Sequence, residues 1–197
     1  NQPMKNGATP AFVAAQNGHL EVLKLLIENG ADVTQGMEDG TTAAFVAARN
    51  GHLEVLKLFV EKGADVTQAR GGVTPALIAA YQGHLDVLRL LIEKGHADVN
   101  QADEDGGTPA LFAAQEGHLE VLRLLIEKGN ADVNRADEGG VTPALVAAQN
   151  GHLEVTRLLV EKGNADVNQA TDTGTTPAFI AARNGHLEVL KLLVQKG

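Results

Sequence analysis

The sequence predicts an all-α fold in which six similar helix–turn–helix units, joined by β-turn or hairpin loops, stack into a solenoid. The first observation is a threonine, usually within Thr-Pro-Ala, that is followed ten residues later by the histidine of a Gly-His step. The six pairs are Thr9/His19, Thr42/His52, Thr74/His84, Thr108/His118, Thr142/His152 and Thr176/His186. The second observation is the spacing between successive threonines, which is 33, 32, 34, 34 and 34 residues. Because the inner spacing is constant while the period varies, the inner segment is rigid and the loops absorb the difference.

The repeat also predicts the domain organisation. Each unit buries its apolar side only against its neighbours, so we expect a single domain over residues 1–197 rather than several separate cores. The expected repeats are approximately 5–37, 38–69, 70–103, 104–137, 138–171 and 172–197.

The first element of each unit is predicted to be a short helix, at 10–17 in the first unit. Thr9 stands before Pro10. A threonine hydroxyl at the N-cap accepts a hydrogen bond from a free backbone amide, and proline at the first helical position has no amide to leave unpaired. Gly18 follows the helix, and glycine adopts the left-handed conformation at a helix end without steric cost.

The second element is predicted to be a longer, mostly apolar helix at about 19–29, closed by Gly30. Its polar residues lie on one narrow stripe, at Glu21, Lys24 and Glu28. This spacing predicts a helix with one solvent-exposed stripe and with its other sides packed against neighbouring helices. The polar, glycine-rich segment 31–40 that follows reads as a hairpin-like turn.

Small residues recur in every short helix, as at Ala14 and Ala15 in the first unit. Their size lets the short helices approach closely, while the leucine-rich second helices fill a wider outer layer. Unequal layers predict a curved stack.

Composition limits the functions that the chain can have. Sixteen basic and 25 acidic residues give a net charge of −9, which disfavours nucleic acid and anionic membranes and favours a neutral or basic partner. The chain has no cysteine, and its longest apolar runs are six residues, such as 43–48, far short of a membrane span. The first seven residues show no basic start and no apolar stretch, so we expect no secretory signal there. These features favour the cytoplasm or nucleus.

The pattern T-P-A-x-x-A-A-x-x-G-H-L-E-V-L-x-L-L-x-x-x-G-A-D-V-N resembles the ankyrin repeat, whose signature is T-P-L-H-x-A at a period of 33. The resemblance covers essentially the whole chain. It implies a scaffold that binds another protein through a concave face made of loop tips and short helices. Alanine replaces the family's leucine after T-P, and the family's histidine is replaced by a bulky apolar residue, at Phe12, Phe45, Leu77, Leu111, Leu145 and Phe179.

Other departures from the repeat are local. One residue is missing between Thr67 and Thr74, and one residue is added in each of three later units, at His96, Asn130 and Asn164. Thr156 stands where the other units have leucine, and Ala43 stands where they have proline. Such irregularities favour natural duplication and drift, with a designed array as the alternative.

Histidines at the same position of every unit raise the question of a metal site. Packed helices lie ~8–10 Å apart and zinc–nitrogen bonds are ~2.0–2.1 Å, so successive histidines cannot share an ion. We expect them to be structural, and the resemblance implies that each ties a short helix to neighbouring backbone. His96 lies outside this column, and we expect it to be solvated.

The acidic stretch from Asp98 to Asp105 resembles a calcium loop, but Asp103 and Pro109 stand where an EF-hand needs glycine and glutamate. We therefore expect a solvated acidic loop and no metal. No nucleophile is accompanied by a base and an orienting group, and the glycines do not have phosphate-binding spacing. We expect no enzyme activity and no cofactor.

Positions that vary between otherwise similar units are candidates for partner binding, because they are not part of the framework. The predicted partner-binding residues are Glu38, Asp39, Arg49, Arg70, Tyr81, Gln82, Glu104, Asp105, Gln115, Glu116, Glu138, Gln149, Asp172 and Arg183; Lys5 and Asn6 hold the same positions in the first unit. Tyr81 is the only tyrosine and is expected to lie between Arg49 and Gln115. Tyrosine and arginine dominate interface hot spots, so Tyr81 is the expected centre.

The sequence leaves several alternatives open. The six units are either a complete scaffold or a segment of a larger enzyme, channel or effector whose chemistry lies elsewhere; a small-ligand or metal-dependent role is disfavoured by the lack of a convergent polar cluster. We expect a monomer, with end-to-end stacking through apolar terminal repeats as the alternative.

Overall fold

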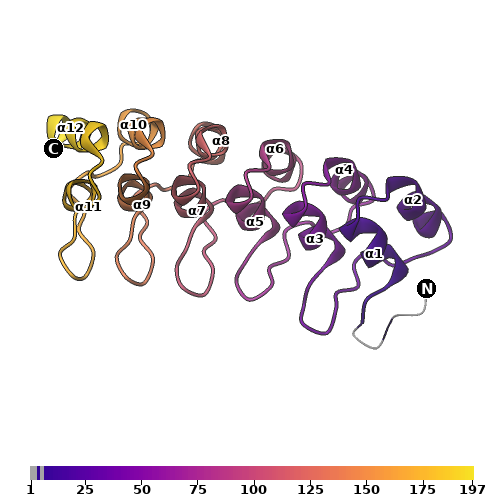
Figure 1. Ribbon diagram of the computed structural model, residues 1–197. Helices are drawn as coiled ribbons and strands as arrows, with labels where there is room; N and C mark the ends of the chain where they lie inside the picture. The colour runs from indigo at the N-terminus through magenta and orange to yellow at the C-terminus, as the bar shows by residue number, and fades with distance from the viewer. Residues whose placement is uncertain (1–3, 5–6) are drawn as a thin grey trace. The chain divides into compact units, whose positions relative to one another are not determined.

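The computed structural model describes residue 4 and residues 7–197, and the described residues contain twelve helices and no β-sheet (Figure 1). The six short helices are α1 (Pro10–Gln16), α3 (Ala43–Arg49), α5 (Pro75–Tyr81), α7 (Pro109–Gln115), α9 (Pro143–Asn150) and α11 (Pro177–Arg183). The six second helices are α2 (Leu20–Glu28), α4 (Leu53–Glu61), α6 (Leu85–Glu93), α8 (Leu119–Gly129), α10 (Leu153–Glu161) and α12 (Leu187–Lys196). The predicted all-α fold of stacked helix pairs is confirmed. The candidate positions Lys5 and Asn6 lie outside the described residues.

The helices group into two compact units, one ending at Asp98 and the other running from Val99 to Gly197. In the first unit α1, α3 and α5 pack in one row and α2, α4 and α6 in a second row. In the second unit α7, α9 and α11 form the short-helix row, and α8, α10 and α12 form the other. Each unit therefore has the same two layers. Whether the chain acts as a single domain stays a prediction.

The short helices begin as the sequence predicts. The hydroxyl of Thr9 accepts a hydrogen bond from the amide of Phe12 at 3.1 Å, and Thr42 caps α3 in the same way although alanine replaces the following proline. All six threonines make this bond. The helix expected at 10–17 ends one residue earlier, because Asn17 is its C-cap and the next residue, Gly18, has a left-handed φ of +71°.

The second helices carry most of the leucines. The helix expected at 19–29 occupies Leu20–Glu28, with His19 and Asn29 as its flanking caps. One leucine position is fully buried in four repeats, at Leu23, Leu56, Leu88 and Leu122. Between the layers the predicted small residues are also fully buried, as Ala47 and Ala48 show. Close packing of the short helices on alanine is therefore observed.

The loops explain the irregular period. In the shortened loop Arg70 and Val73 exchange two backbone hydrogen bonds around Gly71 and Gly72, whose φ values are +54° and +76°. Two consecutive left-handed residues are the requirement of a tight type I′ turn, which glycine meets without strain. The missing residue thus leaves a two-residue hairpin turn.

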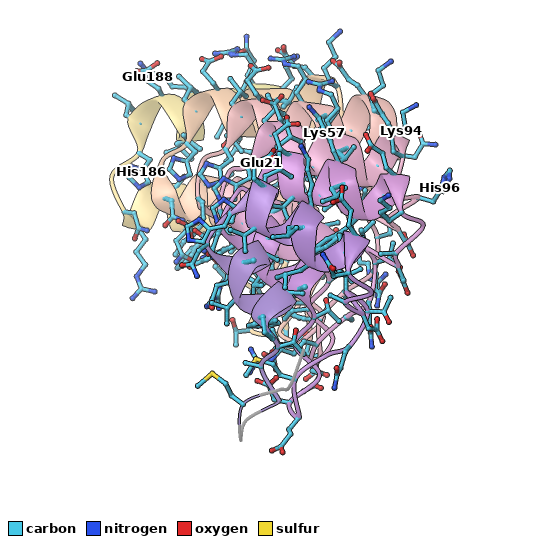
Figure 2. The ribbon with its side chains drawn as sticks, turned by 90° about the vertical axis from the view of Figure 1, so that its right-hand side faces the viewer. Glu21, Lys57, Lys94, His96, His186 and Glu188 are labelled. Atoms are coloured by element: carbon cyan, nitrogen blue, oxygen red, sulfur yellow. The ribbon has the colours of Figure 1, made fainter. Side chains whose placement is uncertain are left out.

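The added residue has one conformation in all three units that contain it. His96, Asn130 and Asn164 have φ values of 55°, 54° and 56°. Asparagine tolerates the left-handed region better than most residues, which accounts for two of the three choices. His96 is exposed and projects from the loop after α6, as expected (Figure 2).

Candidate functional site

The variable positions gather on one side of each unit. We call this side the loop-tip face: it consists of the loop tips and the C-terminal ends of the short helices. In each unit the loops extend from the short-helix row, away from the second helices (Figure 1). Twelve of the fourteen predicted residues are exposed, and the other two, Arg49 and Gln115, are half-buried. All of them can therefore be reached from solvent.

In the first unit the structure brings three predicted residues to one hollow. Asp39, Arg49 and Arg70 line a depression of about 430 Å³ between the loop tips and the short helices. Its lining also includes apolar residues, among them Phe12 and Val46, which we call the apolar floor. A hollow with an apolar floor and charged walls can accept a side chain of a partner and orient its polar end.

Asp39 is held by its own loop and by the next one. Its carboxylate accepts hydrogen bonds from the hydroxyl of Thr41 at 2.6 Å and from the amide of Thr41 at 3.0 Å. The guanidinium of Arg70 lies 2.8 Å from the same carboxylate. The Thr41 hydroxyl and amide, and then Arg70, lower the pKa of Asp39 below its usual range. Asp39 and Arg70 thus fix the rim of the hollow.

Arg49 differs from Arg70 because no carboxylate of a described residue lies within ion-pair distance of it. Arg49 lines the hollow, and its backbone oxygen accepts a hydrogen bond from the ring of His84 at 3.0 Å. Arg49 and Tyr81 are the last residues of α3 and α5, which pack together. The structure therefore places these two predicted residues at adjacent helix ends. The expected position of Gln115 beside Tyr81 stays a prediction, because Gln115 belongs to the other unit.

In the second unit the acidic loop tips form a row. The amide of Glu138 donates to the oxygen of Asp105 at 3.0 Å, and the amide of Asp172 approaches the oxygen of Gly139 at 3.4 Å. Glu104 lies next to Asp105 on the same tip, and all four acidic side chains are exposed. Backbone bonds join these adjacent tips, so this part of the face presents four exposed carboxylates on neighbouring loops.

The remaining candidates lie at helix ends. The backbone oxygens of Gln115 and Gln149 each accept a bond from the histidine ring of the following repeat at 3.0 Å, so only their side chains are available to a partner. The side-chain amide of Gln115 also donates a hydrogen bond to the carboxylate of Glu116 at 2.9 Å. Gln82 and Arg183, at the ends of α5 and α11, are exposed.

Four histidines of the Gly-His steps have the structural role expected of them. The ring of His52 bonds the backbone oxygen of Gln16 at 2.9 Å, and the same bond recurs in three later repeats, made by His84, His152 and His186. Within residue 4 and residues 7–197, no group of three or more acidic or histidine side chains is arranged to hold a metal ion. No helix in the described part of the chain is long and apolar enough to cross a membrane.

Sequence reasoning missed the structural role of Asp39. The signal was present, because Asp32 and Asp65 stand two residues before a threonine and accept the same pair of hydrogen bonds. The pattern Asp-x-Thr therefore marks carboxylates that hold a loop. The apolar floor of the hollow was missed too, since it combines side chains from two repeats.

Comparison with known proteins identifies the family. A family profile described as ankyrin repeats in three copies matches residues 1–70, 67–137 and 130–197. The chain belongs to the ankyrin repeat family. A crystal structure of EF0377, an ankyrin repeat protein, superposes with a TM-score of 0.87 at 26% sequence identity, covering 95% of this chain and 97% of that one. No curated protein sequence matches the chain significantly. Ankyrin repeat domains are generally protein-binding scaffolds and are typically not catalytic.

Proposed function

We propose that this ankyrin repeat domain binds another protein through its loop-tip face. The observation that carries the proposal is the hollow in the first unit, where Arg49 has no ion-pair partner among the described residues and lies at the helix end next to that of Tyr81. Arginine and tyrosine beside an apolar floor have the composition of an interface hot spot. The hydrogen bonds of Asp39 to Thr41 and its ion pair with Arg70 hold this carboxylate before a partner binds, which lowers the ordering cost of binding.

The partner is expected to be neutral or basic at the contact. The acidic row in the second unit and the net charge of −9 attract a basic surface over a distance set by ionic strength. These carboxylates are expected to raise the association rate, with a dependence on salt, more than they lower the dissociation rate. The proposed contact set is the fourteen residues predicted from the sequence.

The test is an affinity measurement on matched double variants, using a partner captured from a lysate of the source organism. Replacing Tyr81 and Arg49 by alanine is expected to weaken binding by at least ~2 kcal/mol, the usual cost of truncating hot-spot residues. The control replaces Lys57 and Glu61, on the second helix α4 (Figure 2 labels Lys57), by alanine. It should bind like the unaltered protein.

Both double variants must first show an unchanged helical circular dichroism spectrum. Equal loss of affinity in the two, or loss only in the α4 control, would place the binding surface on the second helices and reject the proposal. A salt series on a variant of Glu104 and Asp105 distinguishes electrostatic steering from anchoring, because steering predicts that the association rate falls more than the dissociation rate rises.

A further inference from the structure

The charged side chains that line the hollow of the first unit do not balance. Among the described residues that line it, the ionisable ones are Asp39, Arg49 and Arg70. Two guanidinium groups therefore accompany one carboxylate, which leaves one positive charge at this place in a protein whose net charge is −9. The hollow is thus a local exception to the acidic character of the chain.

Asp39 does not neutralise Arg49, because both of its carboxylate oxygens are engaged elsewhere. Oδ1 accepts hydrogen bonds from the hydroxyl and the amide of Thr41, at 2.6 and 3.0 Å. Oδ2 lies 2.8 Å from Nη2 of Arg70. No ion pair among the described residues includes Arg49, so the excess positive charge of the hollow belongs to its guanidinium.

Arg49 is held where it lines the hollow. It is the last residue of α3, and its backbone oxygen accepts a hydrogen bond from the ring of His84 at 3.0 Å. Arg49 is half-buried, and partial burial reduces the screening of a charge by water, which strengthens an ion pair formed there. The planar fork of a guanidinium matches the two oxygens of a carboxylate. Arg49 therefore favours a carboxylate ligand.

The charge pattern does not depend on where the chain begins. Asp39 and Arg49 belong to the second repeat and Arg70 to the third, so each lies in a repeat that has a repeat before it and a repeat after it in the sequence. The unpaired guanidinium is therefore a property of internal repeats.

Apolar side chains border the unpaired charge. Phe12 and Met37 line the same hollow, and Met37 is half-buried, so part of its side chain is available to a ligand. The volume of about 430 Å³ is near the lower end of the range of ligand pockets, ~300–1,000 Å³. This size suits one or two side chains of a peptide segment.

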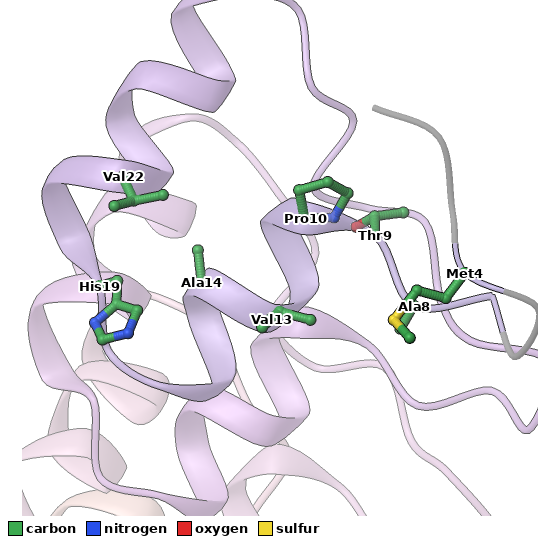
Figure 3. Close-up of a pocket in the computed structure, with 8 residues that line it drawn as sticks. All are labelled: Met4, Ala8, Thr9, Pro10, Val13, Ala14, His19 and Val22. Atoms are coloured by element: carbon green, nitrogen blue, oxygen red, sulfur yellow. The ribbon is translucent and has the colours of Figure 1, made fainter.

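A second hollow beside α1 differs in its chemistry. Figure 3 shows its lining, which includes Thr9, His19 and Val22. No carboxylate or guanidinium is among the described residues that line it. Of these two hollows, the one that Arg49 lines is therefore the one that selects a charged ligand.

Resting on the loop-tip function proposed above, we propose that the hollow takes an acidic side chain, aspartate or glutamate, from a peptide segment of the partner, together with a neighbouring apolar side chain. The carboxylate pairs with the guanidinium of Arg49, and the apolar side chain lies against Phe12 and Met37. The contact surface of the partner is then neutral or basic as a whole, as the acidic row of the second unit favours, but acidic at this one point.

The test selects random linear peptides, displayed on phage, against the full chain and separately against Arg49→Glu, once both proteins show the same helical circular dichroism spectrum. Peptides that bind the unaltered protein are expected to carry aspartate or glutamate next to an apolar residue. Peptides that bind Arg49→Glu are expected to carry lysine or arginine at that place, because the excess charge of the hollow is then reversed.

One peptide selected on the unaltered protein is then measured by fluorescence anisotropy. Arg49→Gln is expected to weaken its binding about tenfold or more, the scale of losing a hydrogen bond between charged groups. Changing the acidic residue of the peptide to its amide should cost the same factor on the unaltered protein and nothing further on Arg49→Gln, because both changes remove one ion pair. Arg89→Gln, at an exposed position of α6, is the matched control and should bind like the unaltered protein.

The proposal is overturned if the library yields no binder, if the selected peptides lack an acidic residue, or if the losses from the two changes add. A library without a binder rejects the acidic ligand alone, because the loop-tip function is tested with a captured protein. Selected peptides that lack an acidic residue but require Tyr81 also leave the loop-tip function in place. Peptides whose binding depends on Lys57 and Glu61, on α4, would reject both.

Discussion

Thr156 offers a quantitative test of the repeat packing. Its side chain is fully buried on α10, at the position where leucine is fully buried in four other repeats. Its hydroxyl donates to the backbone oxygen of His152 at 2.9 Å, and that oxygen also accepts the Thr156 amide at 2.8 Å. Removing the hydroxyl therefore leaves no acceptor unpaired. The change Thr156→Leu is expected to stabilise the protein.

The magnitude follows from three contributions. Leucine adds about two apolar carbon groups, each contributing ~0.8 kcal/mol when buried. Its helix propensity exceeds that of threonine by about 0.5 kcal/mol. The lost hydrogen bond opposes these gains by about 1 kcal/mol. The expected net stabilisation is ~1–2 kcal/mol.

Urea unfolding of the two proteins measures this difference through their midpoints. Thr156→Val is the matched control, because it removes the hydroxyl at nearly constant volume; its midpoint should stay near that of the unaltered protein. An unchanged or lower midpoint for Thr156→Leu would refute the reasoning, since it would mean that this repeat has closed around the smaller side chain and is overpacked by leucine.

Three further predictions concern caps, histidines and acid. Thr142→Ala removes the cap of α9 and should cost about 1 kcal/mol in urea unfolding, with Thr173→Ala, on an exposed loop, as the control. His84→Ala removes the bond to the Arg49 oxygen and should lower the melting temperature, whereas added zinc should leave that of the unaltered protein unmoved; a rise at micromolar zinc would overturn the structural assignment. In Asp32, Asp39 and Asp65, hydrogen bonds from the hydroxyl and then from the amide of the neighbouring threonine lower the carboxyl pKa in the folded state. The stability that these bonds give to the fold is complete above the unfolded pKa of ~3.9 and is lost as pH falls through the lower folded pKa. Melting temperatures should therefore drop at acid pH, and Thr67→Val should make the drop shallower; an equal slope would contradict the assignment.

The sequence predicted what depends on local rules. Thr9 and Pro10 located the start of α1, because capping and proline geometry need only neighbouring residues. The hollow required contacts between Asp39 and Arg70, which lie in different repeats. Which side chains of two repeats contact each other depends on how the repeats are stacked. The pattern of a single repeat does not contain this information.

The same limit applied to contacts between neighbouring repeats. The repeat pattern is the same at Val22 and Val55, yet one is exposed and the other buried. Val55 is covered by the preceding repeat, whose helix α2 packs against α4, and the residue type at this position does not reveal that contact. The sequence alone identified Thr156 as a departure from the repeat, whereas its hydrogen bond to the backbone oxygen of His152 was visible only in the structure.

Amide hydrogen exchange of the protein, free and bound to its captured partner, tests the central claim most directly. Binding through the loop-tip face is expected to slow exchange in the loop tips at 36–41 and 70–73 and at the C-terminal ends of α3 and α5, around the hollow that Arg49 lines. Exchange in the outer stripe of α4, which carries Lys57, should be unchanged. Protection confined to the second helices α2, α4 and α6 would contradict it.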